Sequence, residues 1–394
     1  MSGWVDGVLA VAAVPPLAAS AYLGGLALLA GRPRPMAPGT RTRFDVIVPA
    51  HNEEGEIATT VASLLALEYP GDRFRVLVVA DNCTDATAER AREAGATVLE
   101  RTDRERRGKG YALAHAYAAS LADGVADAVV VVDADTLVSP NLLSAFAARF
   151  EAGAEAVQAE YGVRNPNASW RTRLMRIAFT LFHTLRSNAR ERLGLSCGLR
   201  GNGMGFSTGL LRRVPPRAFS IVEDVEYGVA LGMTGTRVMH VAEAEVLGEM
   251  PATAAASTTQ RERWERGRWA LVREHVPGLL GAARAHGRVP LDLAADLLVP
   301  PLTVLVALVG TGALVALGLY LRGLAGPVGV TPWAVAVACV LAYVARGVAL
   351  SGVGLRALPD LLWAPVYALW KLTLLVRPKG RAGEWVRTAR SHDA

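Results

Sequence analysis

Three segments of this chain are long and apolar enough to cross a lipid bilayer, and they limit where a water-soluble domain can lie. Residues 7–30 and 297–321 contain no charged side chain, and residues 332–350 contain only Arg346. Each has about the 20 residues that a helix needs to cross a hydrocarbon core of roughly 30 Å. We expect an integral membrane protein with a long soluble segment between its first two spans.

Basic residues predict how these spans are oriented. Nothing basic precedes residues 7–30, which argues against a cleaved signal peptide, whereas Arg32, Arg34, Arg41 and Arg43 follow them. By the positive-inside rule the N-terminus lies outside, and the chain after Gly31 is cytoplasmic. The net charge of +6 is then explained by flanks that face anionic lipid, so no nucleic-acid role is needed. The expected location is the cell membrane, with several crossings.

A fourth apolar segment, residues 358–376, carries Asp360 and Lys371 and precedes a basic tail at 377–394. Because that tail suits the cytoplasm, only three full crossings fit, and we interpret 358–376 as an interfacial or re-entrant helix. Residues 170–190 show a continuous apolar stripe with arginines elsewhere, which predicts a helix that lies on the cytoplasmic leaflet.

Between the membrane segments, residues 44–250 alternate between strand and helix patterns. Strands are expected at 43–50, 74–81, 96–101 and 127–135, and helices at 54–67, 85–95 and 108–121. Such alternation predicts an α/β domain with a parallel sheet, in which ligands bind beyond the carboxyl ends of the strands. The Gly-rich stretch 201–207 is expected to be a flexible loop. The three cysteines show no metal-binding spacing, and no disulfide framework is expected.

Polar residues stand at the ends of the expected strands. Asn52, Asp81, Asn82 and Asp85 are each explained by turn formation when taken singly. Together with Asp133 and Asp135, which follow a run of four valines, they predict a pocket that binds a nucleoside and a divalent cation. One acid of this pair would hold the metal while the other meets the ribose or a metal-bound water.

An ordered set of motifs resembles glycosyltransferase family 2, which has the GT-A fold. The motifs are "VIVPAHNEE", "ADNCTDAT", "RGKGYAL", "VVDADT", "VEDVEYG" and the Q-x-x-R-W of "QRERWERGRW". Their order, with flanking spans, is similar to the bacterial processive synthases of cellulose, hyaluronan or chitin oligomers. The resemblance covers roughly residues 44–270.

The resemblance implies a role for each motif. It makes Asp135 the direct ligand of Mg²⁺ or Mn²⁺, and Asp224 the catalytic base with Glu223 as its partner. The diphosphate or the acceptor would meet Gln260, Arg263 and Trp264, which share one helix face at i, i+3 and i+4. The nucleotide sugar would be bound by Pro49, Ala50, Asn52, Glu53, Asp81, Lys109 and Asp133.

The expected organisation is a cytoplasmic GT-A domain inserted between transmembrane helices. Its function would be metal-dependent, inverting transfer from a nucleotide sugar, expected to be a UDP-sugar, to a growing saccharide. Three spans are few for a polymer channel, so single transfer to a lipid or small-molecule acceptor is the alternative; a homo-oligomer is also compatible with the sequence. The expected domains are 1–31 (first span), 44–250 (catalytic, with a nucleotide half 44–135 and an acceptor half 136–250), 251–290 (Q-x-x-R-W and interfacial helices), 291–376 (membrane helices) and 377–394 (tail).

Overall fold

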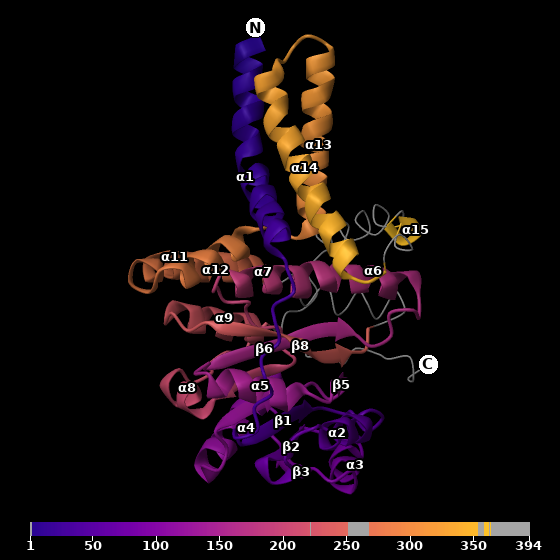
Figure 1. Ribbon diagram of the computed structural model, residues 1–394, viewed down its shortest axis with the longest axis vertical. Coiled ribbons are helices and arrows are strands. Elements are labelled where there is room, and N and C mark those ends of the chain that lie inside the picture. The colour runs from indigo at the N-terminus through magenta and orange to yellow at the C-terminus, as the bar shows by residue number, and fades with distance from the viewer. Residues whose placement is uncertain (1, 221, 251–267, 354–357, 362, 364–394) are drawn as a thin grey trace.

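The structure is a computed structural model that describes residues 2–220, 222–250, 268–353, 358–361 and 363. Three long helices stand side by side at one end of the molecule, and an α/β domain occupies the other (Figure 1). The Q-x-x-R-W motif, most of segment 358–376 and the tail 377–394 lie outside the described residues.

One eight-stranded sheet runs through the α/β domain in the order β3-β2-β1-β4-β7-β6-β8-β5. The first four strands are parallel, as the alternation of strands and helices predicts. The second half is mixed, because β7 is antiparallel to both neighbours and β5 is antiparallel to β8. The strands are β1 (Phe44–Ala50), β2 (Phe74–Asp81), β3 (Thr97–Arg101), β4 (Ala128–Val131), β5 (Thr136–Val138), β6 (Ala156–Val163), β7 (Met204–Ser207) and β8 (Val238–Gly248).

Helices cover both faces of the sheet. Side chains alternate along β1, so Val46 joins one buried cluster while Ile47 joins the other. The first cluster includes residues of α2 (Ile57–Leu65) and α5 (Leu142–Glu151), and the second includes residues of α4 (Lys109–Asp123), α8 (Thr208–Arg213) and α9 (Glu223–Met233). The short helices α3 (Thr87–Glu93) and η1 (Gly71–Arg73) flank β2.

The stretch 201–207 is not the flexible loop that its glycines predict. Residues Met204–Ser207 form strand β7 in the middle of the sheet, between β4 and β6. A Cβ at Gly205 would lie 2.7 Å from a methyl of Val157 and 3.1 Å from the ring of Phe146. The glycine is therefore there because neighbouring side chains fill the space beside the strand, and the expectation of a loop was wrong.

A long helical segment separates the sheet from the three long helices (Figure 1). It consists of α6 (Trp170–Phe179), a π-helical turn η2 (Thr180–Leu185) and α7 (Arg186–Arg192). Leu174, Ile177, Leu181 and Leu185, from the predicted apolar stripe, pack with side chains of the long helices. The expectation that its arginines all lie away from the buried side was wrong, because Arg186 and Arg190 are buried.

Those two arginines pair with aspartates on a neighbouring helix. Arg190 Nε lies 3.0 Å from Asp292 Oδ2, and its Nη2 lies 2.8 Å from Asp296 Oδ1. Arg186 Nη1 lies 3.0 Å from Asp296 Oδ1. The aspartates belong to α12 (Arg288–Leu298), which packs with α11 (Arg268–His286) against α9. An ionic cluster thus lies at the junction between this helical segment and α12.

The three long helices are α1 (Ser2–Leu29), α13 (Leu302–Leu321) and α14 (Pro327–Leu350), and each is long and apolar enough to cross a membrane. They pack closely at glycines. A Cβ on Gly24 of α1 would lie 3.2 Å from Cys339 Cβ of α14, and one on Gly312 of α13 would lie 2.0 Å from the Trp333 ring of α14. Of segment 358–376, the short helix α15 (Leu358–Leu361) and residue 363 are described.

Candidate active site

The predicted donor residues gather where β1 and β2 end. Pro49 and Ala50 are in register with Val79 and Ala80, so the chain leaves both strands at the same edge. Asn52 takes a positive φ of 56°, and its side-chain oxygen accepts from the backbone N–H of Thr84 at 2.8 Å. Such a turn is tolerated by asparagine and ties the two loops together.

Glu53 and His51 complete this edge. Glu53 is buried, its backbone N–H donates to Thr87 Oγ1 at 2.8 Å, and its carbonyl accepts the first N–H of α2. His51 Nδ1 lies 2.7 Å from the backbone oxygen of Asp81. Both residues therefore shape the loop, which agrees with a polar loop role for His51.

Asp81, at the end of β2, is buried and ion-paired. Its Oδ1 accepts from Arg101 Nη1 at 2.6 Å and from Asn82 Nδ2 at 3.0 Å. Arg101, at the end of β3, also donates to Asp103, and its guanidinium carbon lies 5.8 Å from the centroid of the Tyr111 ring. The carboxylate is thus held in place at the strand end by Arg101 and Asn82.

Lys109 contacts acids from two other parts of the site, the turn after β4 and the first turn of α9. It begins α4, and its Nζ donates to Asp133 Oδ1 at 2.5 Å and to the Gly201 carbonyl at 2.6 Å, and lies 3.8 Å from Glu223 Oε1. Burial alone would lower the pKa of this ammonium, but Asp133 and Glu223 outweigh it and raise the pKa to about 12. A cation at a helix start, where the helix dipole disfavours it, is held here by acids from two other elements.

The predicted catalytic base Asp224 and its partner Glu223 lie in the first turn of α9. Burial raises the pKa of Glu223 to about 7, against the opposing effect of Lys109. Burial likewise raises the pKa of Asp224, and Lys109 again opposes it. Two neighbouring acids whose pKa values are moved toward neutrality have the property that proton transfer near pH 7 requires.

The strand expected at 127–135 ends at Val131, so Asp133 and Asp135 lie in the turn after β4 and not in the strand itself. Asp133 is engaged by Lys109, and its backbone N–H donates to Asn202 Oδ1 at 3.1 Å. Asp135 is half-buried. Burial and the charges of Asp133 and Asp135 raise the pKa of the Tyr161 phenol, so both carboxylates are within electrostatic range of that ring.

This donor set fits Mg²⁺ or Mn²⁺ with a substrate present. Carboxylate oxygens are the ligands that these ions prefer. Within the described ranges, no group of three or more His, Cys, Asp and Glu side chains is placed to hold an ion by itself. The protein would therefore supply Asp135, and phosphate oxygens and water the remaining positions, which is how Mg²⁺ commonly binds beside nucleotides.

Three residues to which the sequence assigns no role complete the site. Gly201 has a φ of +77°, and a Cβ there would lie 3.3 Å from Asp224 Oδ2. Asn202 bonds both the Asp133 backbone and Thr136 Oγ1, and Tyr161 faces the acids from β6. The glycine-rich stretch was a signal for the first two, whereas nothing in the sequence marked Tyr161.

Gln260, Arg263 and Trp264 lie outside the described residues, so their predicted role stays a prediction.

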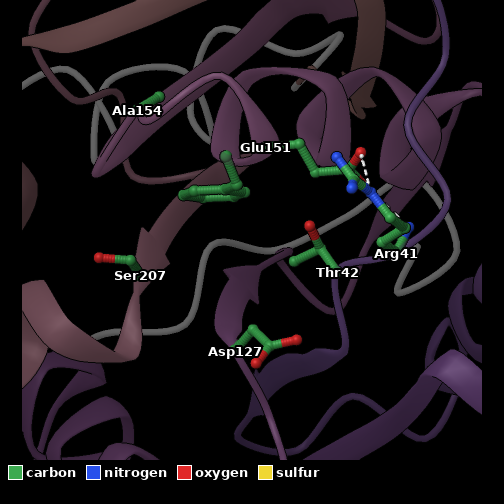
Figure 2. Close-up of a pocket in the computed structure, with 7 residues that line it drawn as sticks. Arg41, Thr42, Asp127, Glu151, Ala154 and Ser207 are labelled. Atoms are coloured by element: carbon green, nitrogen blue, oxygen red, sulfur yellow. Dashed lines mark hydrogen bonds and ion pairs between the residues drawn. The ribbon is translucent and has the colours of Figure 1, made fainter.

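An open pocket lies at the opposite edge of the sheet (Figure 2). Thr42 precedes β1, Asp127 precedes β4, and Arg41 Nε pairs with Glu151 Oε2 at 3.1 Å. Because the candidate site residues follow these strands, this pocket is separate from the site. Its lining residues are Arg41, Thr42, Asp127, Phe150, Glu151, Ala154 and Ser207.

Relatives of known type share this part of the chain. A probable glycosyltransferase of Bacillus subtilis (strain 168), YdaM, is 25% identical over 236 residues, which are 57% of this chain and 55% of that protein. The beta-monoglucosyldiacylglycerol synthase of Synechocystis sp. is 30% identical over 229 residues, 56% of this chain and 47% of that protein. The chain thus spans about half the length of these relatives.

A solved structure and a family profile are also similar to this chain. The mannosyltransferase PcManGT from Pyrobaculum calidifontis, in complex with GDP-Man and Mn²⁺, has a TM-score of 0.56 at 20% identity, covering 94% of this chain and 98% of that one. This likeness shows a GT-A-like fold. The profile described as glycosyltransferase like family 2 matches residues 41–267, more than half of the chain. The chain therefore carries a glycosyltransferase domain and belongs to glycosyltransferase family 2.

Proposed function

We propose that this protein adds a single sugar to each acceptor molecule. The sugar comes from a nucleotide sugar, expected to be a UDP-sugar, and goes to a hydroxyl group of a membrane-embedded acceptor, with inversion at the anomeric carbon. The observation that carries the proposal is the acidic pair Glu223–Asp224, half-buried beside Lys109 at the edge where the parallel strands end.

Asp224 is the proposed base. Its raised pKa lets it accept the proton of the acceptor hydroxyl near neutral pH, while that oxygen attacks the anomeric carbon. Glu223 stands closer to Lys109, which favours its ionised form, so it would hold the lysine and keep negative charge beside the base. A proton moved to Asp224 leaves the acceptor as an alkoxide-like nucleophile at the moment of transfer.

The donor would lie along the strand ends. Asp81 would meet the base or ribose, Asp133 would meet the ribose, and Pro49, Ala50, Asn52 and Glu53 would form the loop beneath them. Lys109 is a point charge within reach of a phosphate bound near Asp133. A divalent ion at Asp135 would offset the charge that develops on the leaving diphosphate.

The packing of the long helices favours single transfer over polymer synthesis. A processive synthase must pass its product across the membrane, whereas α1, α13 and α14 contact one another at Gly24, Gly312 and Gly329. Within the described residues, the inner side chains of this bundle are buried against one another. A relative whose name describes the synthesis of a glucosyldiacylglycerol supports an acceptor that stays in the lipid phase.

We infer that these helices cross the membrane with the N-terminus outside and the catalytic domain in the cytoplasm. The apolar faces of α13 and α14 support this, since Leu314, Leu321, Val328 and Leu341 are exposed. A tag at the N-terminus that external protease removes from intact cells would agree. A tag that the protease removes only after the cells are opened would reverse the orientation.

The function is tested with purified membranes and a panel of UDP-sugars, with Mg²⁺ or Mn²⁺, while UDP release and product mass are followed. We expect a lipid product that is heavier by one sugar. A ladder of products that grows on a single acceptor would instead support the processive alternative. No UDP release with any nucleotide sugar would contradict the proposal.

A further inference from the structure

The loop between α7 and β7 brings a guanidinium group close to the acidic pair. Arg200 directly precedes Gly201, whose carbonyl accepts from Lys109 and where an added Cβ would lie 3.3 Å from Asp224 Oδ2. The backbone N–H of Arg200 donates to Gln158 Oε1 at 2.9 Å, and its Nη2 donates to the Cys197 carbonyl at 2.8 Å. The side chain is therefore fixed from both ends.

The rest of the Arg200 environment is aromatic. Its guanidinium carbon lies 4.3 Å from the centroid of the Phe182 ring, which belongs to the π-helical turn under the long helices. π-helical turns are rare and occur frequently at functional sites. Arg200 Nε is buried, and within the part of the chain that the structure describes it has no hydrogen-bond partner.

Arg200 differs from Arg186 and Arg190 in its ion pairing. Among the described residues, Arg186 and Arg190 pair with Asp292 and Asp296. No carboxylate of a described residue lies within ion-pair distance of Arg200. Asp296 acts on it only at longer range. Arg200 is thus the one cation of the three without a carboxylate partner among the described residues.

Arg200 and His183 also affect each other electrostatically. Burial lowers the pKa of Arg200, Asp296 and Cys197 oppose this effect, and Arg190 and Arg186 lower the pKa further. Burial, and after it the charge of Arg200, holds the pKa of His183 well below its usual range. His183 Nδ1 is also buried without a partner among the described residues. A neutral imidazole and a charged guanidinium therefore lie near one another with unused nitrogens.

We propose that Arg200 is a specificity-determining residue that binds an anionic group, a phosphate or carboxylate, on the acceptor. Buried charges in proteins normally have a partner of opposite sign, and a guanidinium matches such oxyanions in shape. Arg200 is next to Gly201, which adjoins Asp224, and its guanidinium lies over Phe182 in the segment beneath the long helices. An acceptor that enters from the membrane side and whose hydroxyl meets Asp224 would therefore bring a neighbouring anionic group toward Arg200. This inference rests on the proposed function, because it needs an acceptor that enters from the membrane side.

The experiment compares two lipid acceptors in vesicles of equal surface charge. One set contains dioleoylphosphatidylglycerol in phosphatidylcholine, and the other contains dioleoylglycerol with a matching amount of phosphatidylserine. The acceptor KM is measured for the parent protein and for Arg200→Gln, Arg200→Lys and Arg171→Gln, with UDP affinity beside it. Glycerol 3-phosphate and glycerol test whether the anionic group needs a lipid.

Arg171→Gln is the matched control. Arg171 lies on α6, in the same helical segment as Phe182, and its guanidinium carbon also lies over an aromatic ring, 4.4 Å from the centroid of Trp170. The control therefore removes an arginine with a similar ring contact, but one that is not beside Asp224.

We expect the parent protein to prefer the anionic acceptor by about ten- to a hundredfold, the effect of one hydrogen-bonded charge pair. Arg200→Gln should abolish this preference without changing UDP affinity, Arg200→Lys should reduce it, and Arg171→Gln should keep it. Competition by glycerol 3-phosphate alone would identify a soluble ester as the source.

Three results would overturn the inference. A parent protein that uses both lipids equally, or an Arg200→Gln protein that keeps the preference, removes the role of Arg200. Loss of UDP affinity in Arg200→Gln would assign the cation to the donor diphosphate. If Arg200→Gln does not fold, an Arg200→Lys protein that keeps the full preference for the anionic acceptor would also remove the role of Arg200. A parent protein that uses neither lipid would contradict the proposed function itself.

Discussion

Lys109 Nζ lies 3.8 Å from Glu223 Oε1, and the two residues begin the helices α4 and α9, which cover the same face of the sheet. Through this contact, the charge at the start of α4 affects the pKa values of the two acids in the first turn of α9. The ammonium lowers the pKa of both Glu223 and Asp224, against the larger effect of burial.

The pH dependence of transfer follows from this balance. The base must be ionised, and burial raises the pKa of Glu223 to about 7 and that of Asp224 above its usual value. Activity should therefore fall as the pH drops, in a range above the reference pKa of a free carboxylate, about 4. Lys109→Gln should move this limb to higher pH, since the cation that favours both carboxylates is gone. The rate at saturating donor and acceptor is measured from about pH 5 to about pH 9, which brackets that limb. A limb near the reference pKa of a free carboxylate, about 4, would contradict the assignment.

Gly201→Ala should reduce transfer more than folding stability. A left-handed φ costs a residue with a Cβ about 1–2 kcal/mol. Gly194→Ala is the matched control, because its φ is +69° and a Cβ there meets nothing within 4 Å. Both variants should lose similar thermal stability, but only the Cβ at Gly201 lies 3.3 Å from Asp224 Oδ2. Equal transfer rates in the two variants would show that this contact has no consequence.

Arg190→Met should destabilise the protein strongly. It leaves Asp292 and Asp296 buried without their main partner, and breaking a buried ion pair from one side costs about 3–5 kcal/mol. Arg213→Met removes an exposed pair with Glu155 and should cost about 0–1 kcal/mol. Thermal unfolding in detergent compares the two. If the two variants unfold at similar temperatures, the ionic cluster of Arg190 with Asp292 and Asp296 does not hold the catalytic domain to α12.

The sequence predicts the parallel half of the sheet because there a helix lies between each strand and the next one along the chain, from β1 to β4. Residues 74–81 form β2 with the predicted bounds. Strand β7 was missed because Gly203 and Gly205 resemble a loop, while their real cause is the close approach of Val246 and Val157. That approach depends on which strands are neighbours, and a single strand's residues do not encode it.

The prediction of the site was limited in the same way, because the sequence does not show which distant elements meet. Acids at strand ends could be found from local sequence, and Lys109, Asp133, Glu223 and Asp224 do come together in space. The ionic cluster was missed although it carries a signal: Arg186 and Arg190, like Asp292 and Asp296, are four residues apart on a helix and so share a face. Only the fold shows that these two faces meet.

The central claim is that Asp224 removes the acceptor proton while Asp135 acts on the donor. Asp224→Asn keeps the size of the side chain but removes its basicity, so transfer should fall by about 10²–10⁴-fold while UDP affinity is kept. Asp135→Ala should weaken both metal-dependent UDP binding and transfer, because the ion contacts the diphosphate before and during the reaction.

The decisive measurement is UDP affinity by calorimetry, beside the initial transfer rate, for Asp224→Asn, Asp135→Ala and the parent protein in the presence of Mn²⁺. The account predicts that Asp224→Asn binds UDP like the parent and transfers almost nothing. An Asp224→Asn protein that transfers within a few-fold of the parent rate would contradict it and move the base to another acid.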